Sequence, residues 1–107
     1  MLRGEVWWVR FGPAQGGEIQ KERPAIIISA DASNQALNRL QVIPITTNTG
    51  RLFPSEAYVT VNGQRQKAMT DQLTTVSKER LSSPEGRIST SELKQLEQAL
   101  KVQLGLR

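Results

Sequence analysis

Apolar and polar residues alternate along much of the chain with a period of two, which is the pattern of short β-strands. Residues 5–11 alternate in this way and carry tryptophan on both faces. Residues 25–29 and 40–46 are nearly continuous apolar runs, which predict buried strands. Because proline has no backbone N–H, Pro44 predicts that the strand over residues 40–46 lies at a sheet edge or carries a bulge.

The middle of the chain predicts an antiparallel hairpin. Asn62 and Gly63 lie between two extended runs within residues 57–76, and this dipeptide favours a tight hairpin turn. Residues 86–88 predict a further brief strand. Between the strands, residues 12–22 and 46–56 are rich in glycine and polar side chains, which predicts long loops.

A helix is expected near the end of the chain, from about residue 90 to residue 104. Ser89 and Glu92 have the spacing of a capping box, and leucines follow at helical spacing. These leucines, which are expected to pack on the core, are Leu93, Leu96, Leu100 and Leu104. A helical turn is also expected within the polar segment 31–39. The predicted fold is mainly β with a C-terminal helix (α+β): a small, strongly bent antiparallel sheet or partly open, SH3-like barrel.

The composition excludes several classes of protein. With 107 residues, 37% of them hydrophobic, the chain is expected to form one domain over residues 1–107. It contains no cysteine and no histidine, which excludes disulfides, thiolate metal sites and histidine-based catalysis. The net charge of +4 favours an anionic partner such as nucleic acid. The chain has neither a signal peptide nor an apolar run of ~20 residues, so we expect a cytoplasmic protein that does not enter a membrane.

Arg23 is the first candidate for chemistry. It precedes Pro24, and proline disfavours the helical conformation for the residue before it, so Arg23 should be extended at the start of a strand. Glu18 lies five residues earlier in the predicted loop. From the residues alone, two interpretations stay open: Arg23 and Glu18 form an ordinary surface ion pair, or the planar guanidinium binds a phosphate group.

Four segments resemble, in order, the successive motifs of the MazF/PemK family of toxin ribonucleases: RGEVWWVRFGP, GGEIQKERPAIIIS, VIPITTN and TDQLTTVSKERL. The resemblance covers nearly the whole chain. It implies an SH3-like MazF/PemK/CcdB-like toxin fold that forms a homodimer and cleaves single-stranded RNA without a metal or another cofactor. It also implies a cognate antitoxin that lays an acidic segment over the basic RNA-binding groove.

The resemblance also assigns catalytic roles. RNA cleavage by its own 2′-hydroxyl needs a proton acceptor, a proton or compensating charge for the leaving oxygen, and stabilisation of the phosphorane. Arg23 would stabilise the phosphorane, and Thr46 would donate to a non-bridging oxygen. Glu18 would either orient Arg23 or accept the proton of the 2′-hydroxyl, and Asp71 is a candidate for proton transfer as an acid or a base. The chain has Met69 where some relatives have an arginine, and Gly17 where some have a histidine, so the identity of the general acid stays open.

Further residues are candidates for RNA binding: Asn34, Thr47, Asn48, Arg51, Phe53 and Gln72. Phe53 is expected to contact a base, with Arg51 beside it for a phosphate. Several catalytic and RNA-binding candidates also have a structural alternative: Thr46 has strand propensity, Asn34 terminates or caps a helical turn, and Asp71 and Gln72 cap a turn.

Trp7 and Trp8 are expected to pack in the core or in a dimer interface rather than stack on bases.

Two other functions stay open. A catalytically inert SH3-like module would use its long loops as a partner surface, and it would show no cleavage whichever residue is substituted. A gyrase-directed toxin of similar architecture would need its C-terminal residues, but Gly105, Leu106 and Arg107 include no aromatic side chain. A ribonuclease would need Arg23 and Thr46. The RNA sequence that is cleaved does not follow from the chain.

Overall fold

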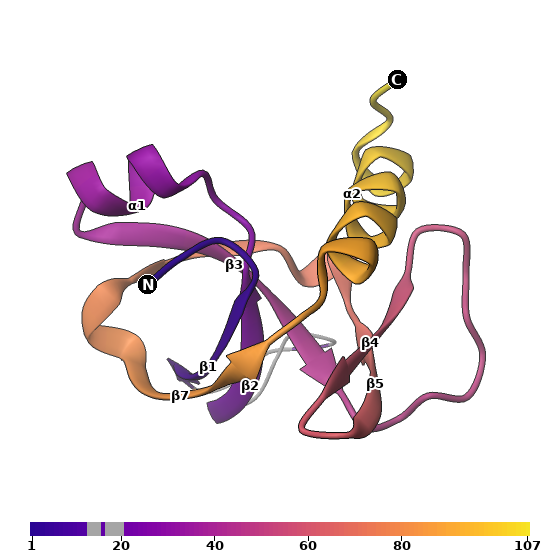
Figure 1. The fold of residues 1–107 in the computed structure, drawn as a ribbon, viewed down its shortest axis with the longest axis horizontal. Helices are drawn as coiled ribbons and strands as arrows, with labels where there is room; N and C mark the ends of the chain where they lie inside the picture. The colour runs from indigo at the N-terminus through magenta and orange to yellow at the C-terminus, as the bar shows by residue number, and fades with distance from the viewer. Residues whose placement is uncertain (13–15, 17–20) are drawn as a thin grey trace.

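The computed structural model describes residues 1–12, 16 and 21–107, and within these residues the chain forms a curled seven-stranded sheet with two α-helices (Figure 1). The elements are β1 (Glu5–Gly12), β2 (Lys21–Ile27), α1 (Asp31–Ala36), β3 (Arg39–Thr46), β4 (Ala57–Val61), β5 (Gln64–Ala68), the 3₁₀ turn η1 (Thr70–Gln72), β6 (Thr74–Ser77), the 3₁₀ turn η2 (Lys78–Arg80), β7 (Leu81–Arg87) and α2 (Thr90–Leu104).

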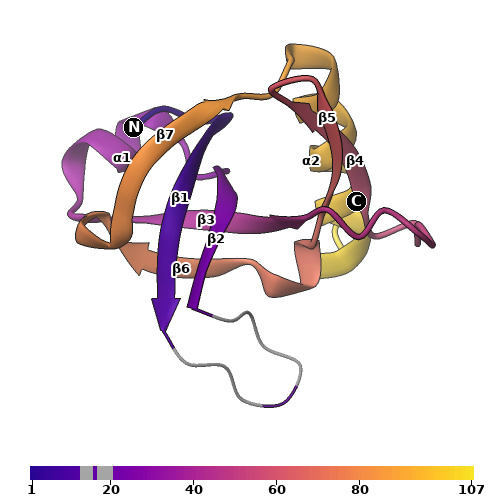
Figure 2. The same ribbon diagram turned by 90° about the horizontal axis from the view of Figure 1, so that it is seen from below.

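The strands follow the order β4-β5-β3-β2-β1-β7, with β6 also paired to β3, and every pairing is antiparallel. The view in Figure 2 shows the sheet curving around an interior, with β7 and the β4–β5 hairpin at its two ends. This arrangement confirms the predicted class of a strongly bent antiparallel sheet with a C-terminal helix.

Pro44 lies in the middle of the sheet, so the prediction of an edge strand is wrong. On one side, β3 pairs with β2, where Pro44 lies opposite Ala25. On the other side, β6 pairs with residues 39–42 and β5 with residues 45–46. The Pro44 carbonyl accepts a hydrogen bond from the Met69 amide on that second side, and the N–H and C=O of one strand residue project the same way. The missing N–H therefore falls in the gap between β6 and β5, where no ladder bond is lost.

Two hydrophobic clusters fill the two sides of the curled sheet. The first cluster joins the sheet to α2 and contains Val6, Ile26, Ile28, Ile43, Ile45, Ala57, Val59, Val61, Ala68, Ile88, Leu96 and Ala99. The second contains Val9, Ala25, Ile27, Leu40, Val42, Val76 and Leu81, with Trp7 and Phe11 packed against it. Because side chains alternate along a strand, β1, β2 and β3 contribute to both clusters.

The C-terminal helix has the predicted bounds, and its capping box is confirmed. The Ser89 hydroxyl accepts from the Glu92 amide at 3.1 Å, and the Glu92 carboxylate accepts from the Ser89 amide at 3.4 Å. The predicted leucine stripe is only partly correct, because Leu104 is 50% exposed while Leu96 is fully buried. Figure 1 shows the reason: the end of α2 projects beyond the sheet.

The described part of the chain has no helix with both the length and the apolar character that crossing a membrane requires.

Ser89→Ala is expected to lower the free energy of unfolding by about 1 kcal/mol, because it removes the acceptor that satisfies a free N–H at the start of α2. Urea denaturation measures this change. Ser91→Ala is the matched control, because Ser91 is an exposed residue inside the same helix and alanine favours helix there. An equal loss in both variants would contradict a specific capping effect.

The hairpin prediction is confirmed, and two predicted strands have different boundaries. Asn62 and Gly63 have positive φ values of 52° and 76°, as a type I′ turn requires. The extended run after this turn is divided into β5, η1 and β6, since β5 and β6 both pair with β3. The brief strand predicted at residues 86–88 is the end of the longer β7.

The helical turn expected within residues 31–39 is α1. The predicted loop over residues 12–22 is shorter at both ends, because β1 continues to Gly12 and β2 begins at Lys21. Of the remaining loop residues, the structure describes only Gly16.

Candidate active site

The pairing of β2 with β3 brings Arg23 and Thr46 together. Ala25 lies opposite Pro44, so the same antiparallel register continued by two residues places Arg23 level with Thr46 and on the same face of the sheet. Both residues line one pocket with a volume of about 320 Å³. Its other polar lining residues come from β1, β2, β5, β7 and the loop after β3: Trp8, Glu22, Thr47, Gln64, Gln66 and Glu85.

Arg23 lines this pocket, and one of its side-chain donors has no partner within the described residues. Its side chain is half-buried, and its Nε is enclosed without a hydrogen-bond partner among the residues that the structure describes. A buried donor without a partner costs about 1–3 kcal/mol. The guanidinium is always charged and presents several donors in one plane, so an anionic ligand with two or more oxygens would fit this position.

Thr46 ends β3 with its hydroxyl already oriented. The Thr46 Oγ1 accepts a hydrogen bond from the Asn48 amide at 3.2 Å. A threonine hydroxyl has one proton to donate and two lone pairs, so this bond leaves the proton available for another acceptor. The two neighbouring candidates, Thr47 and Asn48, are exposed at the start of the loop after β3, and Thr47 also lines the pocket.

Asp71 and Gln72 lie outside this pocket. Both belong to η1, and Met69, the residue before η1, donates its amide N–H to the Pro44 carbonyl of β3. Asp71 is exposed. The structure thus places Asp71 near the strand that carries Thr46 but not with Arg23, and its proposed role in proton transfer stays a prediction.

Asn34 is a buried residue whose side chain forms hydrogen bonds within the protein. It is only 2% exposed, and its amide group bonds both the hydroxyl and the carbonyl of Ser29. These bonds tie α1 to the chain that follows β2. Asn34 does not cap the helix as predicted, because the N-cap position is Ala30.

The loop between β3 and β4 presents Phe53 to solvent. Phe53 is 48% exposed, and the Arg51 guanidinium carbon lies 4.8 Å from the centre of its ring. The loop is fixed to the hairpin, since the Tyr58 hydroxyl donates to the Thr49 carbonyl and the Lys67 ammonium donates to the Arg51 carbonyl. Phe53 and Arg51 are therefore adjacent as predicted, but neither lines the pocket of Arg23.

Glu18, the remaining predicted catalytic residue, lies outside the described residues. Two other carboxylates, Glu22 and Glu85, line the pocket within the described part of the chain. Glu22 follows Glu18 by four residues in the sequence, and its Oε1 accepts a hydrogen bond from the Ser82 hydroxyl at 3.0 Å.

The sequence did not predict that Trp8, Gln66 and Glu85 line the pocket. Trp8 is half-buried on the pocket wall instead of enclosed in the core, and its indole N–H donates to Glu85 at 2.6 Å. One signal was present for Gln66: the two-residue turn at Asn62 and Gly63 places Gln66 opposite an apolar residue of β4. Its place beside Arg23 depends on the pairing of β5 with β3, which no local pattern predicts.

The chain matches the family of PemK-like, MazF-like toxins of type II toxin–antitoxin systems over residues 2–104. Endoribonuclease MazF9 of Mycobacterium tuberculosis is 38% identical over an alignment that covers 99% of this chain and 98% of that protein. The endoribonuclease toxin MazF of Escherichia coli is 28% identical, with 95% of this chain and 92% of that protein covered.

Two solved structures share the fold. One is an endoribonuclease in complex with its cognate antitoxin from a mycobacterial species, with a TM-score of 0.85 and 23% identity over 100% of this chain and 97% of that chain. The other is MazF from Deinococcus radiodurans, with a TM-score of 0.85 and 22% identity over 99% and 97% of the two chains. The chain therefore belongs to the PemK/MazF family of toxins of type II toxin–antitoxin systems, as its motifs predicted.

Proposed function

We propose that this chain is a toxin that cleaves single-stranded RNA, principally mRNA, at a specific sequence and thereby inhibits translation and growth. Its family membership makes it an RNA-cleaving enzyme, since the relatives matched over nearly their whole length are endoribonucleases. One observation supports the site most strongly: Arg23 and Thr46 line the same pocket, and the Arg23 Nε is buried without a partner among the described residues.

The proposed reaction is transesterification by the 2′-hydroxyl of the RNA. The 2′-oxygen attacks the adjacent phosphorus while its proton passes to a base, and the bond to the 5′-oxygen then breaks as that oxygen gains a proton. Negative charge accumulates on the non-bridging oxygens between these events. The Arg23 guanidinium stabilises this charge, and the Thr46 hydroxyl donates to one of the same oxygens. Because arginine stays protonated, it does not transfer the protons; Glu18 and Asp71 are our candidates for that role.

The proposed reaction requires no metal ion. The chain contains no histidine or cysteine, and no group of three or more carboxylates suited to a metal occurs within the described residues. Arg23 supplies at the pocket the positive charge that a metal ion supplies in other nucleases.

We further propose that the chain acts as one toxin domain over residues 1–107, as a homodimer in the cytoplasm, where its mRNA substrate is translated. A cognate antitoxin would neutralise it by laying an acidic segment over the RNA-binding surface. The net charge of +4 supports this pairing, and the mycobacterial structural neighbour was solved with its own cognate antitoxin.

The wild-type protein is expected to cut a long mixed-sequence RNA at discrete sites in excess EDTA. Mapping the ends of the fragments measures both the activity and the recognition sequence, and a shared short motif at the cut sites would support specificity. Cleavage that requires added magnesium would contradict the metal-independent mechanism. If no RNA is cut under either condition, the ribonuclease proposal fails, and gyrase inhibition and protein binding become the functions to measure.

A further inference from the structure

Gln66 is a polar residue in an apolar position. Gln66 is 7% exposed and lies on β5 opposite Val59. Val59 is fully buried, and so is Ala68, which follows Gln66 by two residues on the same face of β5. An apolar side chain would be the ordinary choice for a position facing this interior. Gln66 instead lines the pocket that contains Arg23 and Thr46.

The Gln66 amide is available to a ligand. A glutamine side chain offers two donors and one acceptor, and no hydrogen bond of its side chain is found within the described residues. Buried polar groups in proteins are nearly always hydrogen-bonded. The Gln66 amide atoms also keep some solvent-accessible surface. Among the described residues, the Arg23 Nε is the sole fully enclosed side-chain polar atom without a partner, so the unpartnered Gln66 amide atoms are not fully enclosed. The amide therefore reaches the pocket with its hydrogen-bonding capacity unused.

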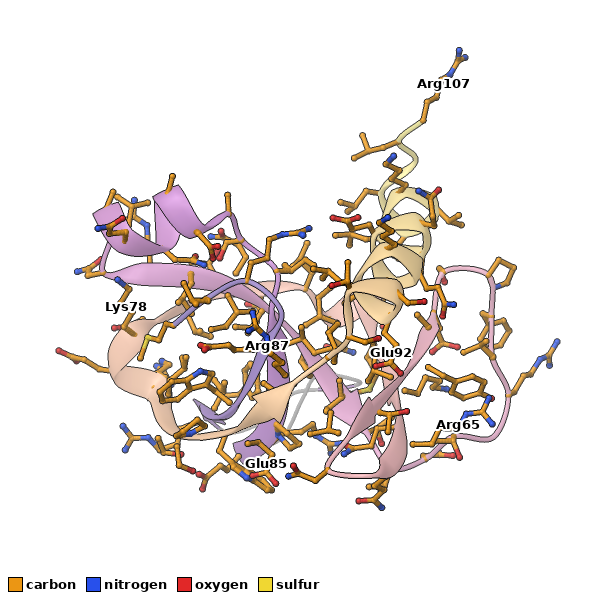
Figure 3. The ribbon with its side chains drawn as sticks, viewed as in Figure 1. Arg65, Lys78, Glu85, Arg87, Glu92 and Arg107 are labelled. Atoms are coloured by element: carbon orange, nitrogen blue, oxygen red, sulfur yellow. The ribbon has the colours of Figure 1, made fainter. Side chains whose placement is uncertain are left out.

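Trp8 supplies a flat apolar wall of the same pocket. Its indole N–H donates to the Glu85 Oε2 at 2.6 Å, and the Asn62 side-chain amide donates to the Glu85 carbonyl at 2.9 Å and to the Glu85 Oε1 at 3.3 Å. Figure 3 shows Glu85 at the lower edge of the molecule, near the turn of the β4–β5 hairpin. The indole is thus held between β1, β7 and this hairpin, and a fixed aromatic ring is a stacking surface for an unpaired base.

We propose that the pocket binds one nucleobase of the RNA substrate next to the cleaved bond, with Gln66 hydrogen-bonded to the edge of the base and Trp8 against its face. This proposal rests on the proposed ribonuclease function. Glutamine forms paired hydrogen bonds with a base that places an amino group beside a ring nitrogen. Glu22 and Glu85 line the same pocket, and ionised carboxylates only accept hydrogen bonds. They favour bases that carry an exocyclic amino group, namely adenine, cytosine and guanine, over uracil, which has none.

Gln66→Met tests the proposal, because methionine has a similar length and no amide. Cut sites mapped on a mixed-sequence RNA should show a base with an exocyclic amino group, and not uracil, at one fixed position beside the cleaved bond for the wild type. Gln66→Met should lose this preference by roughly 5- to 150-fold, the effect of one paired contact. Gln98→Met is the matched control, since Gln98 is exposed on α2. An unchanged preference in a folded Gln66→Met, or uracil beside the bond in the wild type, would overturn the proposal.

A binding measurement distinguishes a failure of this proposal from a failure of the proposed ribonuclease function. Single-stranded oligonucleotides of deoxyadenosine, deoxycytidine or thymidine lack the 2′-hydroxyl and are not cleaved, so fluorescence anisotropy measures their binding alone. The adenine and cytosine oligonucleotides should bind more tightly than the thymine one to the wild type, and Gln66→Met should remove the difference. Gln66→Glu, which keeps the shape and loses the amide donors, serves if the methionine variant does not fold. Equal binding of all three oligonucleotides by the wild type overturns the base subsite even if RNA is cleaved, whereas a base preference without cleavage would contradict only the ribonuclease proposal.

Discussion

Arg23→Ala should lower the rate of RNA cleavage by about 10²- to 10³-fold, the usual loss when a preorganised charge-stabilising group is removed. Arg23 lies at the pocket with Thr46, and its Nε has no partner within the described residues. Its removal therefore breaks no hydrogen bond described for the side chain, so the variant should remain folded. Initial rates on a short RNA that contains a mapped cut site measure the effect, and thermal unfolding confirms the fold.

Two variants control this experiment. Arg23→Lys keeps the positive charge but loses the planar set of donors, so its rate should lie between those of the wild type and Arg23→Ala. Arg39→Ala removes the same charge from an exposed position on β3, outside the pocket, and should leave the rate near that of the wild type. A folded Arg23→Ala with near wild-type turnover would exclude Arg23 from the mechanism.

Leu96→Ala should lower the free energy of unfolding by about 2–5 kcal/mol, the range for a large-to-small substitution in a core. Leu96 is fully buried where α2 packs against the first hydrophobic cluster. Domains of this size are stable by about 5–15 kcal/mol in total, so a large fraction of the stability would be lost. The midpoint and slope of urea denaturation give the change directly.

Leu104→Ala is the matched control because the same side chain is truncated in the same helix. Leu104 is 50% exposed at the end of α2, and substitutions at such positions usually change stability by less than about 0.5 kcal/mol. Similar losses in both variants would show that the buried contact of Leu96 does not determine how firmly α2 is attached.

The sequence correctly predicted the elements that depend on residues close together in the chain. The capping box at Ser89 and the turn at Asn62 and Gly63 depend on residues within a few positions of each other, and both have the expected geometry. The division of the extended run after the turn into β5 and β6 depends on pairing with β3. The prediction from Pro44 was wrong for the same reason. A central strand accepts this proline only because its missing N–H faces the gap between β5 and β6, and these two strands are distant from Pro44 in the sequence.

The candidate site could be predicted only in part. The motif around Arg23 and Thr46 identified two residues that line one pocket. Trp8 and Gln66 were missed because their strands meet this pocket only when the sheet curls, and periodicity gives the face of a strand but not the curvature of a sheet. Asp71 lies apart from the pocket, in η1 between β5 and β6.

Asn62 links the stability of the hairpin to the recognition of RNA that we propose. Its positive φ of 52° forms the turn, and its side chain holds Glu85, which in turn holds Trp8. Glycine and aspartate also suit this turn position. Glycine would have no side chain to hold Glu85, and aspartate would place a second negative charge beside it. Of the residues that favour this turn, asparagine alone serves both purposes, so changes in substrate preference can arise from a surface turn whose two residues lie outside the pocket.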